Sequence, residues 1–119
     1  MKKLRTILFF AGLIPFTLIA GIAAAPALIS QRATWFVADI WAVFTLLWLR
    51  ITCGIRSEVR GAAALPSSNI IYASKHQSAW DTLVLWRTLK RPLFILKREL
   101  YLIPFFGWYL WRSGQIAIN

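Results

Sequence analysis

The apolar positions are unevenly distributed, and two long apolar runs fill the first part of the chain. Residues 6–31 contain no charged side chain, and the basic start MKKLR comes directly before them. A second run, TWFVADIWAVFTLLWLR, extends from Thr34, the expected N-cap, to Arg50. Since about 20 apolar residues are enough for a helix to cross a bilayer, the pattern predicts two consecutive membrane helices.

Three interpretations fit the first run: a secretory signal peptide, a spanning helix, and half of a hairpin that lies in one leaflet. A signal peptide would have the basic start and small residues such as Ala23–Ala25, but this run is longer than the apolar part of such peptides. Pro15 and Pro26 can kink or end the helix. The alternative for both runs is the core of a soluble helical bundle.

Charged and aromatic residues within and around the runs indicate an orientation. An ionised aspartate at the bilayer centre costs roughly 2.5–3.5 kcal/mol, so Asp39 fits better at the level of the headgroups. Trp35, Trp41 and Trp48 also favour the interface. Basic residues flank the pair of runs at both outer ends: Lys2, Lys3, Arg5, Arg50, Arg56 and Arg60. By the positive-inside rule we predict a two-helix membrane anchor, residues 1–53, with both ends in the cytoplasm.

Residues 54–119 contain shorter segments in which strand and helix patterns alternate. After the connecting strand and loop GIRSEVRGAAALPSSN, the runs IIYAS, RPLFIL and SGQIAIN have the apolar, β-branched character of strands. SAWDTLVLWRTLK has Leu83, Trp86 and Leu89 at helical spacing, and IPFFGWYLWR predicts a short helix that starts at Pro104. This order predicts an α/β layer built on right-handed crossovers. Because no helix follows the last strand, we expect the fold to continue beyond this sequence.

The overall composition favours a membrane protein with an anionic partner. Hydrophobic residues make up 59% of the chain, where about 45–50% is usual for a soluble domain. The 14 basic and 4 acidic residues give a net charge of +10, which suits an anionic lipid or small molecule. We expect no nucleic-acid partner, because the aromatic residues fall within apolar runs. A single cysteine, Cys53, and a single histidine exclude an intrachain disulfide and argue against a zinc site, so we expect no metal or redox cofactor.

The only histidine of the chain, His76, lies five positions before Asp81, one of four acidic residues. Within one continuous helix these two side chains would point about 140° apart and would not meet. However, SAWD matches the S-x-x-D capping box, so Ser78 is expected to cap a helix, with Asp81 in its first turn and His76 in the preceding loop. The carboxylate could then hold one imidazole nitrogen while the other accepts a proton. The alternative is that Asp81 only caps the helix and His76 is a surface residue.

Two motif blocks in this region match those of a known family. KHQSAWD fits an H-x4-D motif, with Lys75 where the family most often has asparagine. FILKRELYLIPFFGWYLW fits a K-x-E-L…P-x-x-G block, and SGQIAIN is similar to the strand that leads into the next block. The matched positions of the second block are Lys97, Glu99, Leu100, Pro104 and Gly107. In order and spacing, these blocks resemble the glycerolipid acyltransferases, specifically the bacterial 1-acyl-sn-glycerol-3-phosphate (lysophosphatidic acid) acyltransferases.

The resemblance implies transfer of a fatty acyl group from acyl-CoA or acyl carrier protein to the free 2-hydroxyl of lysophosphatidic acid, which gives phosphatidic acid. His76 would be the general base for that hydroxyl, and Asp81 would orient His76. Lys97 would bind the anionic substrate or the developing oxyanion, whereas the other matched residues of its block would be structural. The enzyme would act at the cytoplasmic face of the bacterial inner membrane, on membrane lipid and an acyl thioester.

The resemblance is incomplete, because the family's arginine block and its phosphate-binding E-G-T-R block have no counterpart in residues 1–119. We therefore expect residues 54–119 to be the first half of a glycerolipid-acyltransferase α/β domain, truncated at its C-terminus, with weak or absent turnover by this chain alone. Two alternatives stay open. One is an acyltransferase for another acceptor, such as a lyso-ornithine lipid or glycerol 3-phosphate; the other is a non-catalytic membrane remnant whose basic surface binds anionic lipid.

Overall fold

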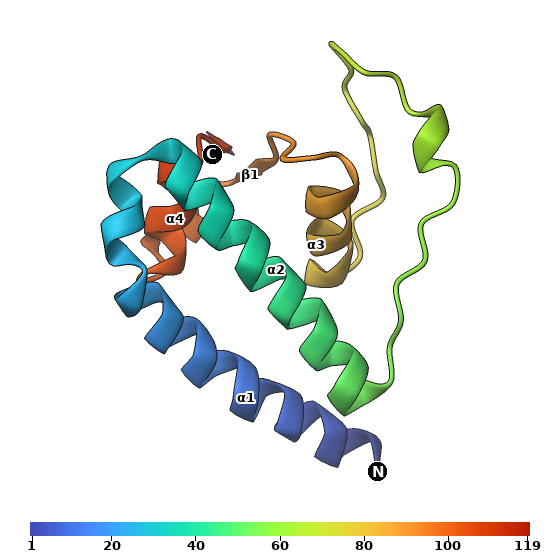
Figure 1. Cartoon of the computed structure of the whole chain (residues 1–119), viewed down its shortest axis with the longest axis vertical. Helices are drawn as coiled ribbons and strands as arrows, with labels where there is room; N and C mark the ends of the chain where they lie inside the picture. The colour runs from blue at the N-terminus through green and yellow to red at the C-terminus, as the bar shows by residue number, and fades with distance from the viewer.

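The computed structural model describes all 119 residues and consists of a long helical hairpin with a smaller α/β unit along one side of it (Figure 1). The hairpin comprises α1 (Lys2–Ala23), the 3-10 turn η1 (Ala25–Ile29) and α2 (Gln31–Cys53). The remaining elements are the 3-10 turns η2 (Ala62–Ala64) and η3 (Arg98–Leu102), the helices α3 (Ala79–Thr88) and α4 (Phe106–Arg112), and the strands β1 (Ile95–Lys97) and β2 (Ile116–Ile118). Both apolar runs are thus helical, as predicted.

Tryptophan side chains hold the two helices of the hairpin in antiparallel contact. Trp41 donates a hydrogen bond from Nε1 to Oγ1 of Thr17 (2.9 Å), and Trp48 donates from Nε1 to the carbonyl oxygen of Phe9 (3.0 Å). A buried indole N–H needs such a partner. Two of the three tryptophans expected at the membrane interface therefore point towards α1 instead.

The start of α2 differs from the prediction. Thr34 is not the N-cap, because the helix begins at Gln31 after Ser30 and Thr34 is fully buried within it. The hydroxyl of Thr34 donates to the carbonyl oxygen of Ser30 over 3.0 Å. A threonine inside a helix can bond a carbonyl one turn earlier in this way, so its presence does not require a helix start. Pro26 opens the η1 turn, whereas Pro15 lies inside α1 without ending it.

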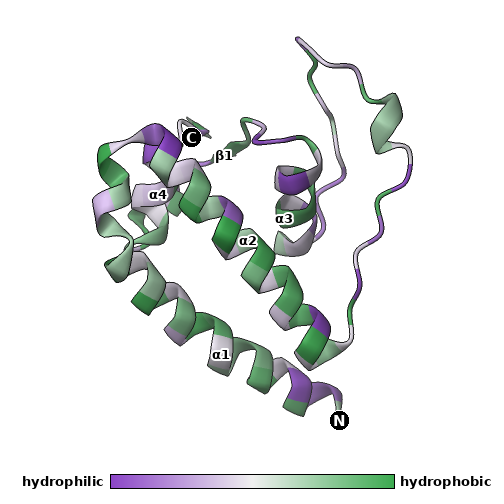
Figure 2. Ribbon diagram, in the orientation of Figure 1, coloured by the Kyte–Doolittle hydropathy of each residue, from purple (hydrophilic) through white to green (hydrophobic).

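The helices of the hairpin are rich in hydrophobic residues along their length (Figure 2), and many of their large apolar side chains are exposed. No residue of α1 is buried, and the buried residues of α2 are Thr34, Ala42 and Thr45. By length and composition both helices could cross a membrane, a test that the enclosed core helix of a soluble protein also passes. Residues 54–119 leave most of the surface of these two helices uncovered.

The strand predicted for residues 70–74 is absent. Residues 54–77 leave the end of α2 as a long excursion that contains only the short turn η2 before it returns to α3 (Figure 1). Strand backbone is stabilised by hydrogen bonds to a neighbouring strand, and none lies beside this segment. The apolar side chains that suggested a strand remain in solvent, with Ile71 95% exposed.

The two strands that do form are parallel, with Ile95 opposite Ile116 and Lys97 opposite Ile118. η3 and α4 provide the crossover that a parallel pair requires. The strand in RPLFIL covers only the end of this run, because Pro92 has no N–H to donate to a ladder. α4 also begins two residues later than predicted, after a residue with a φ of 62°. The sheet therefore has two strands, and neither the connecting strand predicted within residues 54–69 nor the strand predicted at residues 70–74 forms.

α4 approaches η3 so closely that Gly107 has no room for a side chain. A Cβ atom built at Gly107 would overlap the backbone carbonyl of Tyr101. We expect Gly107→Ala to lower the free energy of unfolding by about 1–3 kcal/mol, the usual cost of overpacking, in a denaturant titration. Gly21→Ala is the matched control and should cost less, because its Cβ would lie 3.3 Å from a side-chain atom of Phe105. Equal stability of the two variants would contradict this account.

Candidate active site

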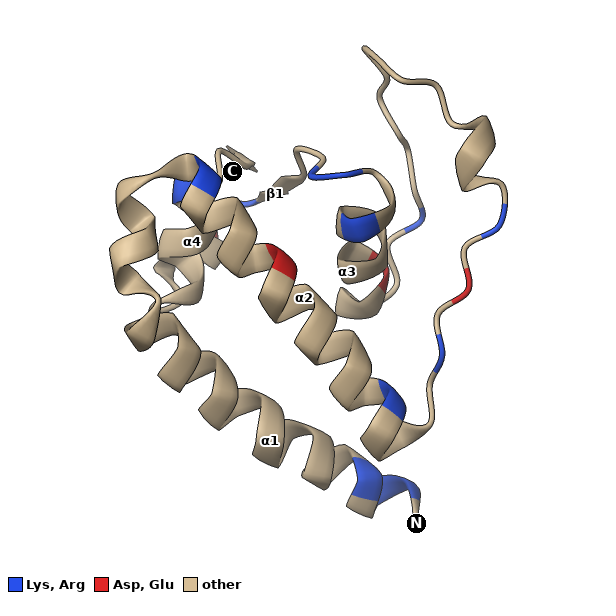
Figure 3. Cartoon of the chain, in the orientation of Figure 1, with Lys and Arg blue, Asp and Glu red and all other residues tan.

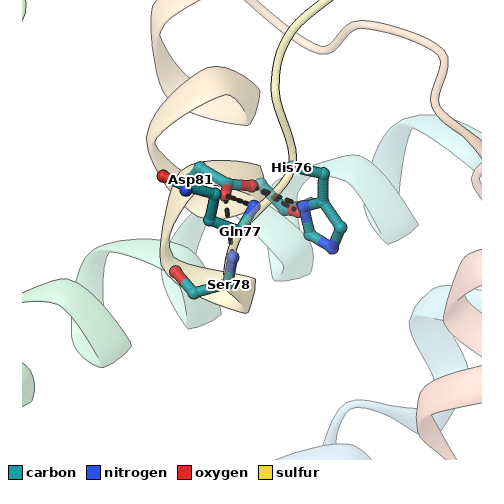
Figure 4. Close-up of polar contacts among 5 residues, drawn as sticks. His76, Gln77, Ser78 and Asp81 are labelled. Atoms are coloured by element: carbon teal, nitrogen blue, oxygen red, sulfur yellow. Dashed lines mark hydrogen bonds and ion pairs between the residues drawn. The ribbon is translucent and has the colours of Figure 1, made fainter.

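His76 and Asp81 lie together at the start of α3 (Figure 4). Nδ1 of His76 donates a hydrogen bond to Oδ1 of Asp81 over 2.7 Å. Ser78 is the N-cap and Asp81 the third residue of the helix, so the capping box predicted from the sequence is confirmed. Because the backbone is extended before Ser78 and helical after it, the chain bends where the imidazole and the carboxylate must meet.

Backbone groups hold the carboxylate of Asp81 in place. The N–H groups of Gln77 and Ser78 donate to Oδ2 over 2.8 and 2.9 Å. Burial alone would raise the pKa of Asp81, but the hydrogen bonds from Gln77, Ser78 and His76 outweigh it and lower the pKa from 3.8 to about 2. Asp81 is therefore ionised at any pH near neutrality, and its carboxylate can accept a hydrogen bond from a protonated Nδ1 of His76.

The arrangement leaves one imidazole nitrogen free to react. With the proton on Nδ1 and shared with Asp81, Nε2 of His76 carries a lone pair and points away from the carboxylate (Figure 4). The side chain of His76 is 69% exposed, while that of Asp81 is 17% exposed. An accessible base next to a shielded carboxylate can remove a proton from a hydroxyl group, because the carboxylate stabilises the imidazolium that results.

Lys97 lies on a different element, at the end of β1. Its side chain is exposed and forms no ion pair or hydrogen bond with His76, Asp81 or any other residue. The structure therefore brings two of the three predicted site residues together and leaves the third apart from them.

The surface around His76 is open. A cavity of about 360 Å³ lies between the hairpin turn and α4 and does not include the pair. Its lining residues are Leu28, Tyr101, Gly107, Trp108, Trp111 and Arg112. His76 itself is exposed next to the start of α3 and does not line this cavity.

Two contacts that hold α3 in place could not be found by reading the sequence. Trp80 donates from Nε1 to Oγ of Ser57 over 3.0 Å, which ties the connecting segment to the first turn of α3. Asp39 of α2 accepts hydrogen bonds from Trp86 and Arg91. The partners are far apart along the chain, and the only sequence signal was an isolated acid within an apolar helix.

Several known proteins are similar to this chain. An acyltransferase family model matches residues 56–119, which is more than half of the sequence. Over its whole length the chain is 36% identical to a 1-acyl-sn-glycerol-3-phosphate acyltransferase of Pseudomonas aeruginosa and 30% identical to one of Chlamydomonas reinhardtii. A human 1-acyl-sn-glycerol-3-phosphate acyltransferase alpha is 40% identical over 62% of this chain. No solved structure matches the chain.

The chain covers 48% of the Pseudomonas protein, 37% of the algal one and 27% of the human one, so it spans about half the length of these curated relatives or less. The region matched by the family model starts just after the hairpin and contains both motif blocks. The resemblance drawn from those blocks is therefore confirmed, and this protein belongs to the acyltransferase family.

Proposed function

We propose that this protein transfers a fatty acyl group from acyl-CoA or acyl carrier protein to the 2-hydroxyl of lysophosphatidic acid, which forms phosphatidic acid. The observation that carries the proposal is the 2.7 Å hydrogen bond between His76 and Asp81 inside the region matched by the family. The relatives of this chain are named 1-acyl-sn-glycerol-3-phosphate acyltransferases, which supports lysophosphatidic acid as the acceptor.

His76 is the general base of the proposed reaction. Nε2 takes the proton of the 2-hydroxyl as the oxygen attacks the carbonyl carbon of the thioester, and Asp81 stabilises the imidazolium. The tetrahedral intermediate then collapses with cleavage of the C–S bond, and the imidazolium returns its proton to the leaving sulfur. The products are phosphatidic acid and the free thiol of the carrier, and His76 is neutral again. No side chain is acylated, and the acyl donor is a substrate rather than a cofactor.

Lys97 is proposed to bind the anionic substrate or to stabilise the oxyanion of the intermediate. Its ammonium group is exposed and has no carboxylate partner in the chain, so its charge is available to a ligand. Such a charge lowers the barrier where negative charge grows in the transition state. Because β1 and α3 are separate elements, a substrate would have to extend from His76 to the end of β1.

Residues 1–53 are proposed as a membrane anchor and residues 54–119 as part of the acyltransferase domain. The exposed apolar faces of the hairpin support this division. Basic side chains gather where the two helices of the hairpin end, near the N-terminus (Figure 3). They would attract anionic lipid, by about 1 kcal/mol for each charge near the surface. We place the protein at the cytoplasmic face of the bacterial inner membrane, with the site facing the cytoplasm.

We infer that the hairpin lies in one leaflet rather than spanning the bilayer. The α/β unit contacts the turn of the hairpin as well as α2. Nε of Arg112 donates a hydrogen bond to the carbonyl oxygen of Leu28 over 2.8 Å. The hydroxyl of Tyr109 donates one to the carbonyl oxygen of Gly21, near the end of α1, also over 2.8 Å. In a spanning hairpin with both ends in the cytoplasm, the turn would lie across the bilayer from residues 54–119. These contacts support a hairpin whose turn lies on the same side of the membrane as the α/β unit.

Labelling of single cysteines tests this arrangement. In a Cys53→Ser background, Ile29→Cys places a thiol on the turn, where the native side chain is 83% exposed. We expect a membrane-impermeant maleimide to react with it in inside-out vesicles and not from the periplasmic side. Glu58→Cys, at an exposed position of the connecting segment, is the cytoplasmic reference. Reaction of Ile29→Cys from the periplasmic side alone would show that the hairpin spans the membrane.

An acceptor panel tests the proposed reaction itself. The complete protein in native membranes would be supplied with acyl-CoA or acyl carrier protein and with lysophosphatidic acid, a lyso-ornithine lipid or glycerol 3-phosphate, and the products would be identified by mass spectrometry. We expect phosphatidic acid from lysophosphatidic acid and little product from the other two. Preference for another acceptor would correct the substrate. No product with any acceptor would favour the non-catalytic membrane protein.

A further inference from the structure

Asp39, the only acidic residue of the hairpin, links the hairpin to the α/β unit through both of its carboxylate oxygens. Its Oδ1 accepts a hydrogen bond from Nε1 of Trp86 over 2.8 Å. Its Oδ2 accepts two from Arg91, over 2.8 Å from Nη2 and 3.2 Å from Nε. An exposed ion pair alone contributes little to stability, but this one shares its carboxylate with an indole that is only 8% exposed. The three side chains thus form one connected cluster.

The chain around Arg91 is shaped to place its guanidinium on Asp39. Lys90 and Arg91 have positive φ values of 53° and 68°, a region that side-chain-bearing residues adopt at a cost. The N–H of Arg91 bonds to the carbonyl oxygen of Trp86 (3.2 Å), and its guanidinium lies over the ring of Trp35 at 5.6 Å from the centroid. Two residues of α2 therefore hold the side chain of Arg91: Trp35 through a cation–π contact and Asp39 through an ion pair.

The cluster positions both elements that carry the proposed site. Trp86 lies in the same short helix as Asp81, and Arg91 begins the segment that leads to β1 and Lys97. Trp86 also stacks on Phe94, just before β1, with ring centroids 6.4 Å apart. Trp86 is the only large apolar side chain of the protein that is buried. The carboxylate of Asp39 therefore joins α2 directly to the one buried aromatic residue of the helix that carries Asp81.

We propose that Asp39, Arg91 and Trp86 form a polar clamp that sets the position of the His76–Asp81 pair on the hairpin, so that the pair can reach an acceptor lipid held in the bilayer. This inference rests on the proposed function. Asp39 and Arg91 are positioning residues, because neither touches His76 or the reacting atoms. The clamp also explains why an acid is present in an otherwise apolar helix. Removing one charge of the pair would leave the other unpaired next to lipid, while removing both would not.

The test compares acceptors in two physical states, with the complete protein reconstituted in vesicles of phosphatidylethanolamine and phosphatidylglycerol. For Asp39→Asn and Arg91→Gln, we expect the acylation rate of long-chain lysophosphatidic acid in the vesicles to fall by up to about 10²-fold, the effect of misplacing a reacting group by about 1 Å. The rate with a short-chain, water-soluble lysophosphatidic acid should stay within about twofold of the native rate, because the His76–Asp81 bond is local.

Arg87→Gln is the control for charge, since Arg87 is exposed on α3 and has no polar partner. Equal loss with both acceptors would mean general damage and overturn the proposal.

A second measurement does not depend on activity. A nitroxide at Gln77→Cys, in the Cys53→Ser background, reports the depth of the site in the bilayer through its accessibility to oxygen and to a nickel chelate. We expect Asp39→Asn and Arg91→Gln to change this depth, Arg87→Gln to leave it unchanged, and the double variant Asp39→Asn/Arg91→Gln to restore it in part. An unchanged depth in both single variants would overturn the clamp. If the native protein acylates none of the acceptors, the proposed function fails, while the depth measurement still decides whether the clamp positions the site.

Discussion

Replacing His76 with alanine is expected to lower the rate of acyl transfer about 10²–10⁴-fold, the usual contribution of a positioned general base. Nε2 of His76 is the group of the pair that can take a proton, because the ionised carboxylate of Asp81 already accepts hydrogen bonds from four donors. The imidazole is 69% exposed and has a single hydrogen bond, so its removal should change stability little. Initial rates with lysophosphatidic acid in vesicles would be measured together with the membrane-bound fraction, which should remain at the native level.

Two further variants make this result specific. His76→Gln can still donate a hydrogen bond to Asp81 but cannot take up the proton, and it should lose as much activity as the alanine variant. Arg87→Gln on the exposed side of α3 should keep the native rate. If His76→Ala left function intact while deletion of residues 6–49 abolished it, the protein would be a membrane module and not an acyltransferase in its own right.

The contact between His76 and Asp81 could be predicted because it depends on the local sequence. A capping box fixes the start of a helix from four residues, and it places the third helical residue next to the segment before the cap. The same local reasoning located the two apolar helices, the strand before Asn119 and the helix at the end of the second motif block. In the helices, neighbours along the chain supply the backbone hydrogen bonds, whereas the strand depends on its pairing with β1.

Features that depend on distant partners were predicted poorly. Residues 70–74 have the composition of a strand, but a strand needs a neighbour, and the chain provides none at that place. Thr34 has the character of a cap, yet its hydroxyl is satisfied inside the helix by the carbonyl of Ser30. The partners of Asp39 are 47 and 52 positions away, and no pattern in the sequence links them. The position of Lys97 relative to His76 and Asp81 also depends on residues distant in the sequence, because it is set by the packing of β1.

Replacing Asp81 with asparagine is expected to lower kcat by a similar factor, about 10²–10⁴, by moving the proton of His76. Asparagine offers one acceptor oxygen and one donor NH2 group. In the native protein the N–H groups of Gln77 and Ser78 bond to Oδ2 over 2.8 and 2.9 Å, so the single oxygen of asparagine should stay with them. The NH2 group would then face Nδ1 of His76 and donate to it. Nδ1 would lose its proton, Nε2 would carry one, and Nε2 could no longer accept the proton of a hydroxyl.

Nitrogen-15 NMR of the labelled imidazole distinguishes this mechanism from a simple loss of charge. We expect Nδ1–H in the native protein and Nε2–H in Asp81→Asn, with the cap of α3 largely retained. The pH dependence of stability should change as well. Because the pKa of Asp81 is lowered from 3.8 to about 2, its ionisation stabilises the native fold above pH 3.8, and this contribution is lost as the pH falls through about 2. The variant should lack that dependence. If it loses activity while Nδ1–H persists, the charge of Asp81 matters to the reaction and the position of the proton does not.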